Sequence, residues 1–234
     1  MSFINRQPIV ILGGFLISDK SYEPMKDFLI KKTNMPVDII RANKFDWLLT
    51  NWEIGWTNLI NRVDIAVKRM IELSPTGKVT LIGHSSGGLM MRLFLSEEPF
   101  AHRIYNGAKN CNILITLGSP NHASYGTRLR LMVDRRLPGS FYNDKVKYIS
   151  VAGKIDIEND KSITNFTKKS ALNSYKSILG ESDIDGDGLV PIKSALLHGS
   201  KQIILENTSH GGFFGKYWYC SKERVNLWWE KLNY

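Results

Sequence analysis

A Gly-x-Ser-x-Gly motif at positions 83–87 is the clearest sign of chemistry in the sequence. It follows an apolar run at 79–82, which is typical of a buried strand, and precedes an apolar helical pattern at 86–96. So tight a turn between strand and helix strains the backbone of Ser85 and projects its hydroxyl above the edge of the sheet. The motif therefore predicts a nucleophile at Ser85. The alternative is a glycine-rich turn that holds a structural serine.

A serine hydroxyl is a weak nucleophile until a base takes its proton and a carboxylate orients that base. After such a strand-turn-helix serine, the acid and then the histidine follow along the chain. His210 follows closely on the last apolar run, so we expect it to be the general base, whereas His84 adjoins the nucleophile but is expected to point in a different direction. Asp187, just before Gly-Leu-Val-Pro, is predicted to be the acid, with Asp156 as the reserve candidate.

Two glycines end the first apolar run, at 8–12, and the turn that they form presents a free backbone N–H to the nucleophile. Phe15 in this turn and Ser86 at the start of the next helix are predicted to donate these N–H groups to an oxyanion. Each such donor stabilises the transition state by about 3 kcal/mol. The alternative is a tight strand-to-helix turn without a ligand.

The aspartates around Asp187 also suggest a metal site. Asp183, Asp185 and Asp187 match the first half of a calcium-binding loop, but its twelfth position is Ser194 instead of the glutamate that binds calcium through both oxygens. Pro191 lies inside the same stretch. We therefore expect no metal and no cofactor.

Short apolar runs alternate with longer amphipathic ones along the 234 residues. The predicted strands are 8–12, 37–40, 79–82, 113–117, 146–151 and 202–205, and the predicted helices are 22–32, 58–73, 86–96 and 222–232. This alternation predicts an α/β fold whose six-stranded, mostly parallel sheet carries helices on both faces. A chain of this length can bury one large core, and no linker composition divides it, so residues 1–234 are expected to form a single domain.

Several motifs together resemble the lipase type of α/β-hydrolase. They are Gly13-Gly14-Phe15, the 83–88 turn, Thr116-Leu-Gly-Ser-Pro120, Asp187-Gly-Leu-Val-Pro191 and Ser209-His210. In order and spacing they resemble bacterial triacylglycerol lipases and the hydrolases grouped with glycosylphosphatidylinositol deacylases, including short cyanobacterial or plastid members. The resemblance implies a compact six-stranded α/β-hydrolase fold, a triad of Ser85, Asp187 and His210, and oxyanion donors at Phe15 and Ser86. Gly13-Gly14 departs from the His-Gly of many lipases at this turn.

These residues predict a serine hydrolase that cleaves carboxylic esters through an acyl-enzyme intermediate. An acyltransferase or a thioesterase would use the same triad, because only the leaving and entering groups differ. A hydrolase-like binding protein without turnover is the alternative from another class. The expected partner is a small acyl ester or a lipid.

Two longer segments, 121–142 and 154–185, interrupt the alternation and are candidates for lid or cap segments. The first contains Arg128, Arg130, Arg135 and Arg136 in an amphipathic pattern. Such a helix either covers the active site and contacts an anionic membrane, in keeping with the net charge of +9, or packs on the sheet with a solvated polar face. Because the basic residues are spread along the chain, nucleic acid is not an expected partner.

The location expected from the sequence is the cytoplasm, with peripheral membrane contact if the first segment is a lid. The first seven residues lack the basic and apolar regions of a signal peptide, and no apolar run reaches the length of a membrane span. Cys111 and Cys220 fit no disulfide framework or metal spacing, which favours a reducing compartment.

Overall fold

The computed structural model describes residues 6–159 and 163–232. Within them, six strands form one sheet in the order β2-β1-β3-β4-β5-β6, with every neighbouring pair parallel. The strands are β1 Ile9–Leu12, β2 Val37–Ile39, β3 Val79–His84, β4 Cys111–Leu117, β5 Lys147–Lys154 and β6 Lys201–Glu206. Because all strands run the same way, their carboxyl ends meet at one edge of the sheet, where the loops that follow them converge.

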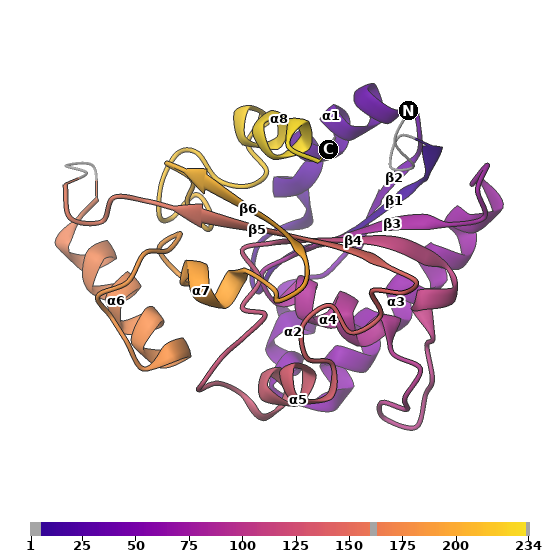
Figure 1. Ribbon diagram of the computed structural model, residues 1–234, viewed down its shortest axis with the longest axis horizontal. Helices are drawn as coiled ribbons and strands as arrows, with labels where there is room; N and C mark the ends of the chain where they lie inside the picture. The colour runs from indigo at the N-terminus through magenta and orange to yellow at the C-terminus, as the bar shows by residue number, and fades with distance from the viewer. Residues whose placement is uncertain (1–5, 160–162, 233–234) are drawn as a thin grey trace.

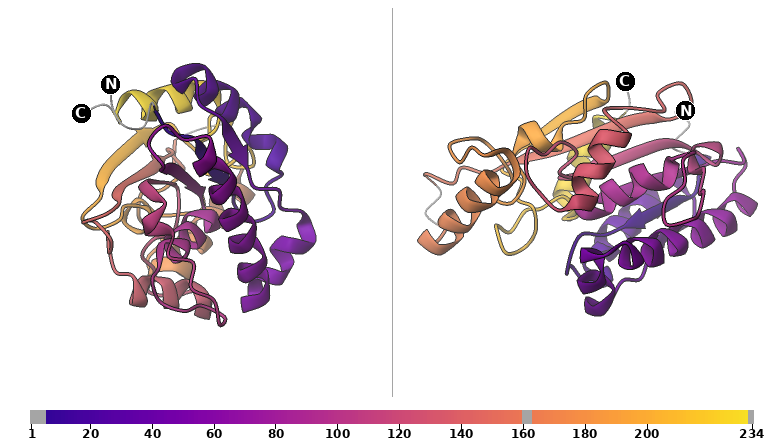
Figure 2. Two further views of the ribbon diagram at one scale, coloured as in Figure 1. Left: turned by 90° about the vertical axis from the view of Figure 1, so that its right-hand side faces the viewer. Right: turned by 90° about the horizontal axis from the view of Figure 1, so that it is seen from below.

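Helices cover both faces of this sheet (Figure 1). One face carries α1 Glu23–Thr33 and α8 Lys222–Glu230, which lie side by side in Figure 2. The other carries α2 Lys44–Leu48, α3 Glu53–Glu72, α4 Ser86–Leu95 and α5 Arg128–Arg136. The helices α6 Asn165–Leu179 and α7 Ile192–Ala195 lie beside the β5–β6 end of the sheet, and short 3-10 turns occur at Asp19–Tyr22, Leu49–Asn51 and Gly107–Lys109.

The two-residue period of the strands directs their side chains into separate cores on the two faces of the sheet. In β1, Val10 and Leu12 pack with α3 and α4, whereas Ile9 and Ile11 pack with α1 and α8. All four side chains are fully buried. Strands that are apolar on both faces can only be stabilised between two helical layers, so the near-continuous apolar runs of the sequence already require this arrangement.

The predicted α/β fold class is confirmed, and the differences lie in individual elements. Helix α3 begins at Glu53, five residues before the expected start, because Trp52 is extended and ends the preceding turn. The short α2 was not predicted, although a capping box marks it: Asn43 accepts the Asp46 N–H at 3.0 Å, and the Asp46 carboxylate accepts the Asn43 N–H at 2.8 Å. No helix among the described residues combines the length and the apolar character that crossing a membrane requires.

Candidate active site

Ser85 lies at the junction of β3 and α4. Its φ of 53° and ψ of −126° form a combination that non-glycine residues rarely adopt. Gly87 lies so close to β1 that a Cβ atom there would be 2.3 Å from the Leu12 carbonyl oxygen, so only glycine fits behind the turn. The packing of α4 against β1 thus maintains the strained turn that carries the hydroxyl, as the motif predicts.

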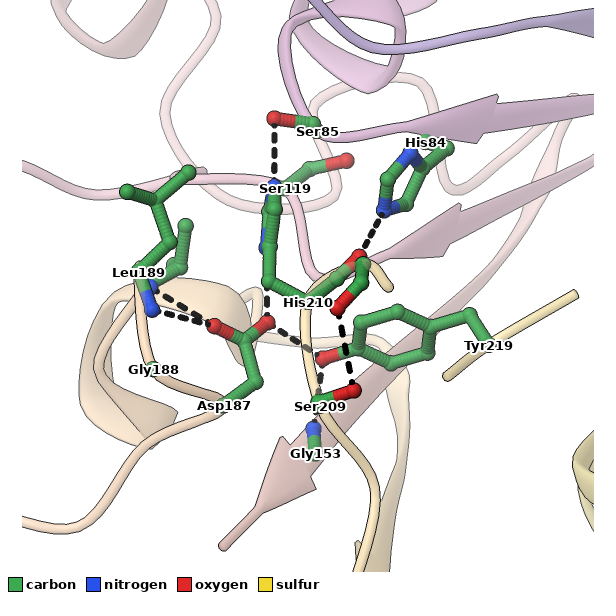
Figure 3. A network of polar contacts seen from close by, with 12 residues as sticks. His84, Ser85, Ser119, Gly153, Asp187, Gly188, Leu189, Ser209, His210 and Tyr219 are labelled. Atoms are coloured by element: carbon green, nitrogen blue, oxygen red, sulfur yellow. Dashed lines mark hydrogen bonds and ion pairs between the residues drawn. The ribbon is translucent and has the colours of Figure 1, made fainter. Parts of the chain in front are cut away.

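His210 lies in the loop that follows β6. Its Nε2 atom is 2.9 Å from Ser85 Oγ (Figure 3). Both side chains are almost entirely buried. The backbone N–H of His210 also donates to the Asp187 carbonyl oxygen at 2.7 Å, so two loops are joined beside the ring. An imidazole in this position can take the proton of the serine hydroxyl.

Asp187 is fully buried, and its Oδ2 atom is 2.9 Å from His210 Nδ1. Its Oδ1 atom accepts the N–H groups of Leu189 and Val190, at 3.0 and 2.7 Å (Figure 3). A carboxylate in this position holds one tautomer of the imidazole and stabilises the imidazolium that forms when the ring takes a proton. The structure therefore brings together the three side chains of the predicted triad.

Tyr219 is a member of this network that the sequence analysis missed. Its hydroxyl donates to Asp187 Oδ2 at 2.7 Å and accepts the Gly153 N–H at 2.6 Å. Burial raises the pKa of Tyr219 well above 10.0, and the nearby Asp187 raises it further, so the hydroxyl keeps its proton and remains a donor. An isolated tyrosine between a loop and a helix has no sequence pattern that would have identified it.

Of the two predicted oxyanion donors, Phe15 lies in the loop after β1 and Ser86 lies at the start of α4. Ser86 is the first residue of α4, where the helix dipole favours negative charge. A Cβ atom at Gly14 would be 2.8 Å from Ser85 Cβ, so the loop that carries Phe15 lies directly against the serine. Neither the Phe15 nor the Ser86 N–H has an acceptor among the residues that the structure describes. The oxyanion role of these two N–H groups stays a prediction.

A cavity of about 570 Å³ opens beside Ser85 and His210. Its apolar lining is Phe15, Ile17, Leu189, Phe213, Phe214 and Trp218. His210 is the single titratable side chain among the described lining residues, so the cavity suits an uncharged, apolar group.

The reserve acid and the calcium interpretation do not fit this geometry. Asp156 is exposed, and its Oδ1 atom accepts the backbone N–H of Asn159 at 3.0 Å. Asp185 pairs with Lys154 at 2.8 Å, while the Asp187 oxygens accept protein donors. Asp185 and Asp187 thus have different partners. In the described ranges, no group of three or more acidic, histidine or cysteine side chains is placed to bind a metal.

His84 does point away from the Ser85 hydroxyl, but it is not remote from the site. Its ring is fully buried, with its centroid 4.8 Å from that of His210. Burial lowers the pKa of His84 well below 6.5, and the neighbouring His210 lowers it further.

The candidate lid segments lie outside the lining of the cavity. Within 121–142, α5 buries Leu129 and Val133 in the core that it shares with α3 and α4. None of the described residues of 121–142 or 154–185 lines the cavity beside Ser85. The lid interpretation stays a prediction.

Comparison with known proteins shows likeness in structure alone. No protein-family profile matches the chain, and no curated protein matches it. The propeptide form of lipase BlEst2 from Bacillus licheniformis is 17% identical, with a TM-score of 0.55 over 97% of this chain and 49% of that one. A candidate cell surface hydrolase from Lactobacillus plantarum WCFS1 is 14% identical, with a TM-score of 0.53 over 97% of this chain and 92% of the other.

This chain thus spans about half the length of the Bacillus licheniformis lipase. Both superpositions cover nearly all of the present chain. Together with the parallel six-stranded sheet between two helical layers, they show that the chain has the α/β-hydrolase fold.

Proposed function

We propose that this protein is a serine hydrolase that cleaves carboxylic esters with apolar acyl groups, in the manner of an esterase or lipase. The observation that carries the proposal is the pair of 2.9 Å contacts from the two ring nitrogens of His210, one to Ser85 Oγ and one to Asp187 Oδ2. In a non-catalytic binding protein, neither a buried triad nor a strained serine backbone would be needed.

In the proposed reaction, Ser85 Oγ attacks the ester carbonyl carbon while His210 Nε2 accepts the hydroxyl proton. The carbonyl oxygen becomes an oxyanion, which accepts hydrogen bonds from the Phe15 and Ser86 N–H groups. His210 then returns the proton to the leaving alcohol. Water, activated by the same imidazole, releases the acid and restores the Ser85 hydroxyl.

The cavity supports an apolar acyl group as the substrate. Among the described lining residues, none offers a charged partner to a carboxylate or an amine beyond the predicted base itself. Thioester cleavage and acyl transfer would use the same groups, so they are compared directly in the assay below.

A fluorophosphonate probe tests the proposal. It should label the wild-type protein and fail to label Ser85→Ala. The matched control is Ser177→Ala, which should be labelled like wild type because Ser177 is exposed on α6. Hydrolysis of p-nitrophenyl esters should fall about a million-fold in kcat for Ser85→Ala. Esters of increasing chain length, thioesters and an added alcohol acceptor then distinguish the three reactions. Equal labelling of wild type and Ser85→Ala would contradict the proposal.

A further inference from the structure

A second chain of buried hydrogen bonds joins the loop after β1 to the backbone of His210. The Gly14 N–H donates to the Tyr22 hydroxyl at 2.7 Å. The Tyr22 hydroxyl is 2.9 Å from His84 Nδ1, and His84 Nε2 is 3.1 Å from the His210 carbonyl oxygen. Tyr22 and His84 are both fully buried. Three segments that are distant in the sequence therefore meet through two side chains.

The acceptors in this chain fix where each proton lies. Burial and the neighbouring His210 lower the pKa of His84, so its ring is neutral and carries one proton. The His210 carbonyl oxygen can only accept, so His84 Nε2 carries the ring proton. Nδ1 of the neutral ring is then an acceptor, and the Tyr22 hydroxyl, whose pKa burial raises well above 10.0, donates its proton to it.

Close packing limits the positions that this loop can take. A Cβ atom at Gly13 would be 2.6 Å from the Tyr22 ring, and one at Gly14 would be 3.0 Å from His84 Nδ1. The loop therefore rests on Tyr22 and His84 as well as bonding to them. The next backbone N–H after Gly14 belongs to Phe15, the predicted oxyanion donor.

We propose that Tyr22 and His84 are positioning residues that hold the Phe15 N–H and the His210 ring in fixed relation to Ser85. The Tyr22 end fixes the donor loop through Gly14, and the His84 end fixes the backbone of the base. This inference rests on the proposed function. The hydrogen bonds of Tyr22 and His84 are separate from those of the triad. In the described part of the chain, neither side chain forms a hydrogen bond with Ser85 Oγ or with Asp187.

Tyr22→Phe tests the proposal because it removes one oxygen and retains the ring. The Phe15 donor should then be misplaced in the transition state, so kcat for a p-nitrophenyl ester should fall about 10- to 100-fold with KM unchanged. Tyr142→Phe is the matched control: its hydroxyl accepts the Glu97 N–H at 3.0 Å, beyond the far end of α4. Its kcat should stay within about twofold of wild type.

His84→Gln provides a second test, because glutamine can still donate to the His210 carbonyl but offers no ring nitrogen to Tyr22. Both substitutions break the contact between Tyr22 and His84, so the double variant should lose less activity than the product of the two single losses. Losses that multiply fully, or a Tyr22→Phe variant with the kcat of wild type, would overturn the proposal.

Amide hydrogen exchange at Gly14 is the readout that does not depend on turnover. Exchange should be faster in Tyr22→Phe than in wild type and unchanged in Tyr142→Phe, because only the first substitution frees the Gly14 N–H. If the fluorophosphonate probe does not label the wild-type protein, the proposed function is contradicted. The exchange measurement still tests the hydrogen bond between Tyr22 and Gly14 in that case. Equal exchange at Gly14 in all three proteins would refute the link itself.

Discussion

The buried neutral His84 makes a specific prediction for the pH dependence of stability. Its folded pKa lies well below 6.5, the ordinary value that it has in the unfolded chain, because burial and His210 disfavour the charged ring. Below pH 6.5 the unfolded chain therefore binds a proton that the folded protein does not bind. The free energy of unfolding must fall as the pH falls through this range.

The magnitude follows from proton linkage at a single site. A histidine with an ordinary pKa in the unfolded chain and a much lower pKa in the folded protein makes the free energy of unfolding depend on pH. From about pH 7.5 to pH 5.5, this lowers the free energy of unfolding by about 1.4 kcal/mol. Urea denaturation of wild type and His84→Gln at these two pH values measures it. The pH-dependent loss should be smaller by this amount in His84→Gln, because contributions from other groups are common to both proteins.

His198→Gln is the matched control, because the His198 side chain is exposed and belongs to neither hydrogen-bonded network. This variant should show the same pH-dependent loss as wild type. If wild type and His84→Gln lose equal stability over the range, His84 takes up a proton inside the folded protein. The neutral tautomer, and the direction assigned to its two hydrogen bonds, would then be wrong.

Three further substitutions test the site. In Gly14→Ala the added Cβ, 2.8 Å from Ser85 Cβ, should displace the oxyanion loop and lower kcat for a p-nitrophenyl ester about 100-fold; unchanged turnover would exclude this loop as a donor. Asp187→Asn should lower kcat about 10⁴-fold, with an unchanged circular dichroism spectrum, because the amide no longer selects the imidazole tautomer. Tyr219→Phe leaves the Gly153 N–H buried without its acceptor, so the free energy of unfolding in urea should fall by about 1–3 kcal/mol, and an equal urea midpoint would contradict this role.

The sequence predicts the fold and the positions of the site loops because both depend on local patterns. Apolar runs of strand length that alternate with amphipathic helices require a parallel sheet, and the parallel sheet brings every strand end to one edge. Ser85 and His210 can be predicted because each lies in the turn or loop that follows a strand, β3 for Ser85 and β6 for His210. Asp187 is less local, since its choice over Asp156 depended on the neighbouring Gly-Leu-Val-Pro and on its place 23 residues before His210.

The supporting contacts could not be predicted, because they join residues that have no pattern in common. Tyr219 reaches Asp187 across 32 positions, Tyr22 reaches His84 across 62, and His84 reaches the His210 carbonyl across 126. A single tyrosine or histidine in an apolar environment packs equally well in many orientations. Only the three-dimensional packing decides which backbone group its polar atom meets.

Tyrosine hydroxyls recur as the acceptors for backbone groups around this site, and physical chemistry explains why. The pairs are Tyr22 with the Gly14 N–H, Tyr175 with the Gly188 N–H and Tyr219 with the Gly153 N–H, at 2.7, 2.8 and 2.6 Å. Two of these glycines lie in loops, where no neighbouring strand can accept a buried N–H, and Gly153 lies at the end of β5.

A tyrosine meets this need from within the core, because its ring packs as an apolar group while its hydroxyl reaches a loop, with only two side-chain torsions to fix. All three tyrosines are fully buried. The three hydroxyls come from the turn before α1, from α6 and from the turn before α8, so removing one of them should loosen the loop that it bonds without unfolding the sheet.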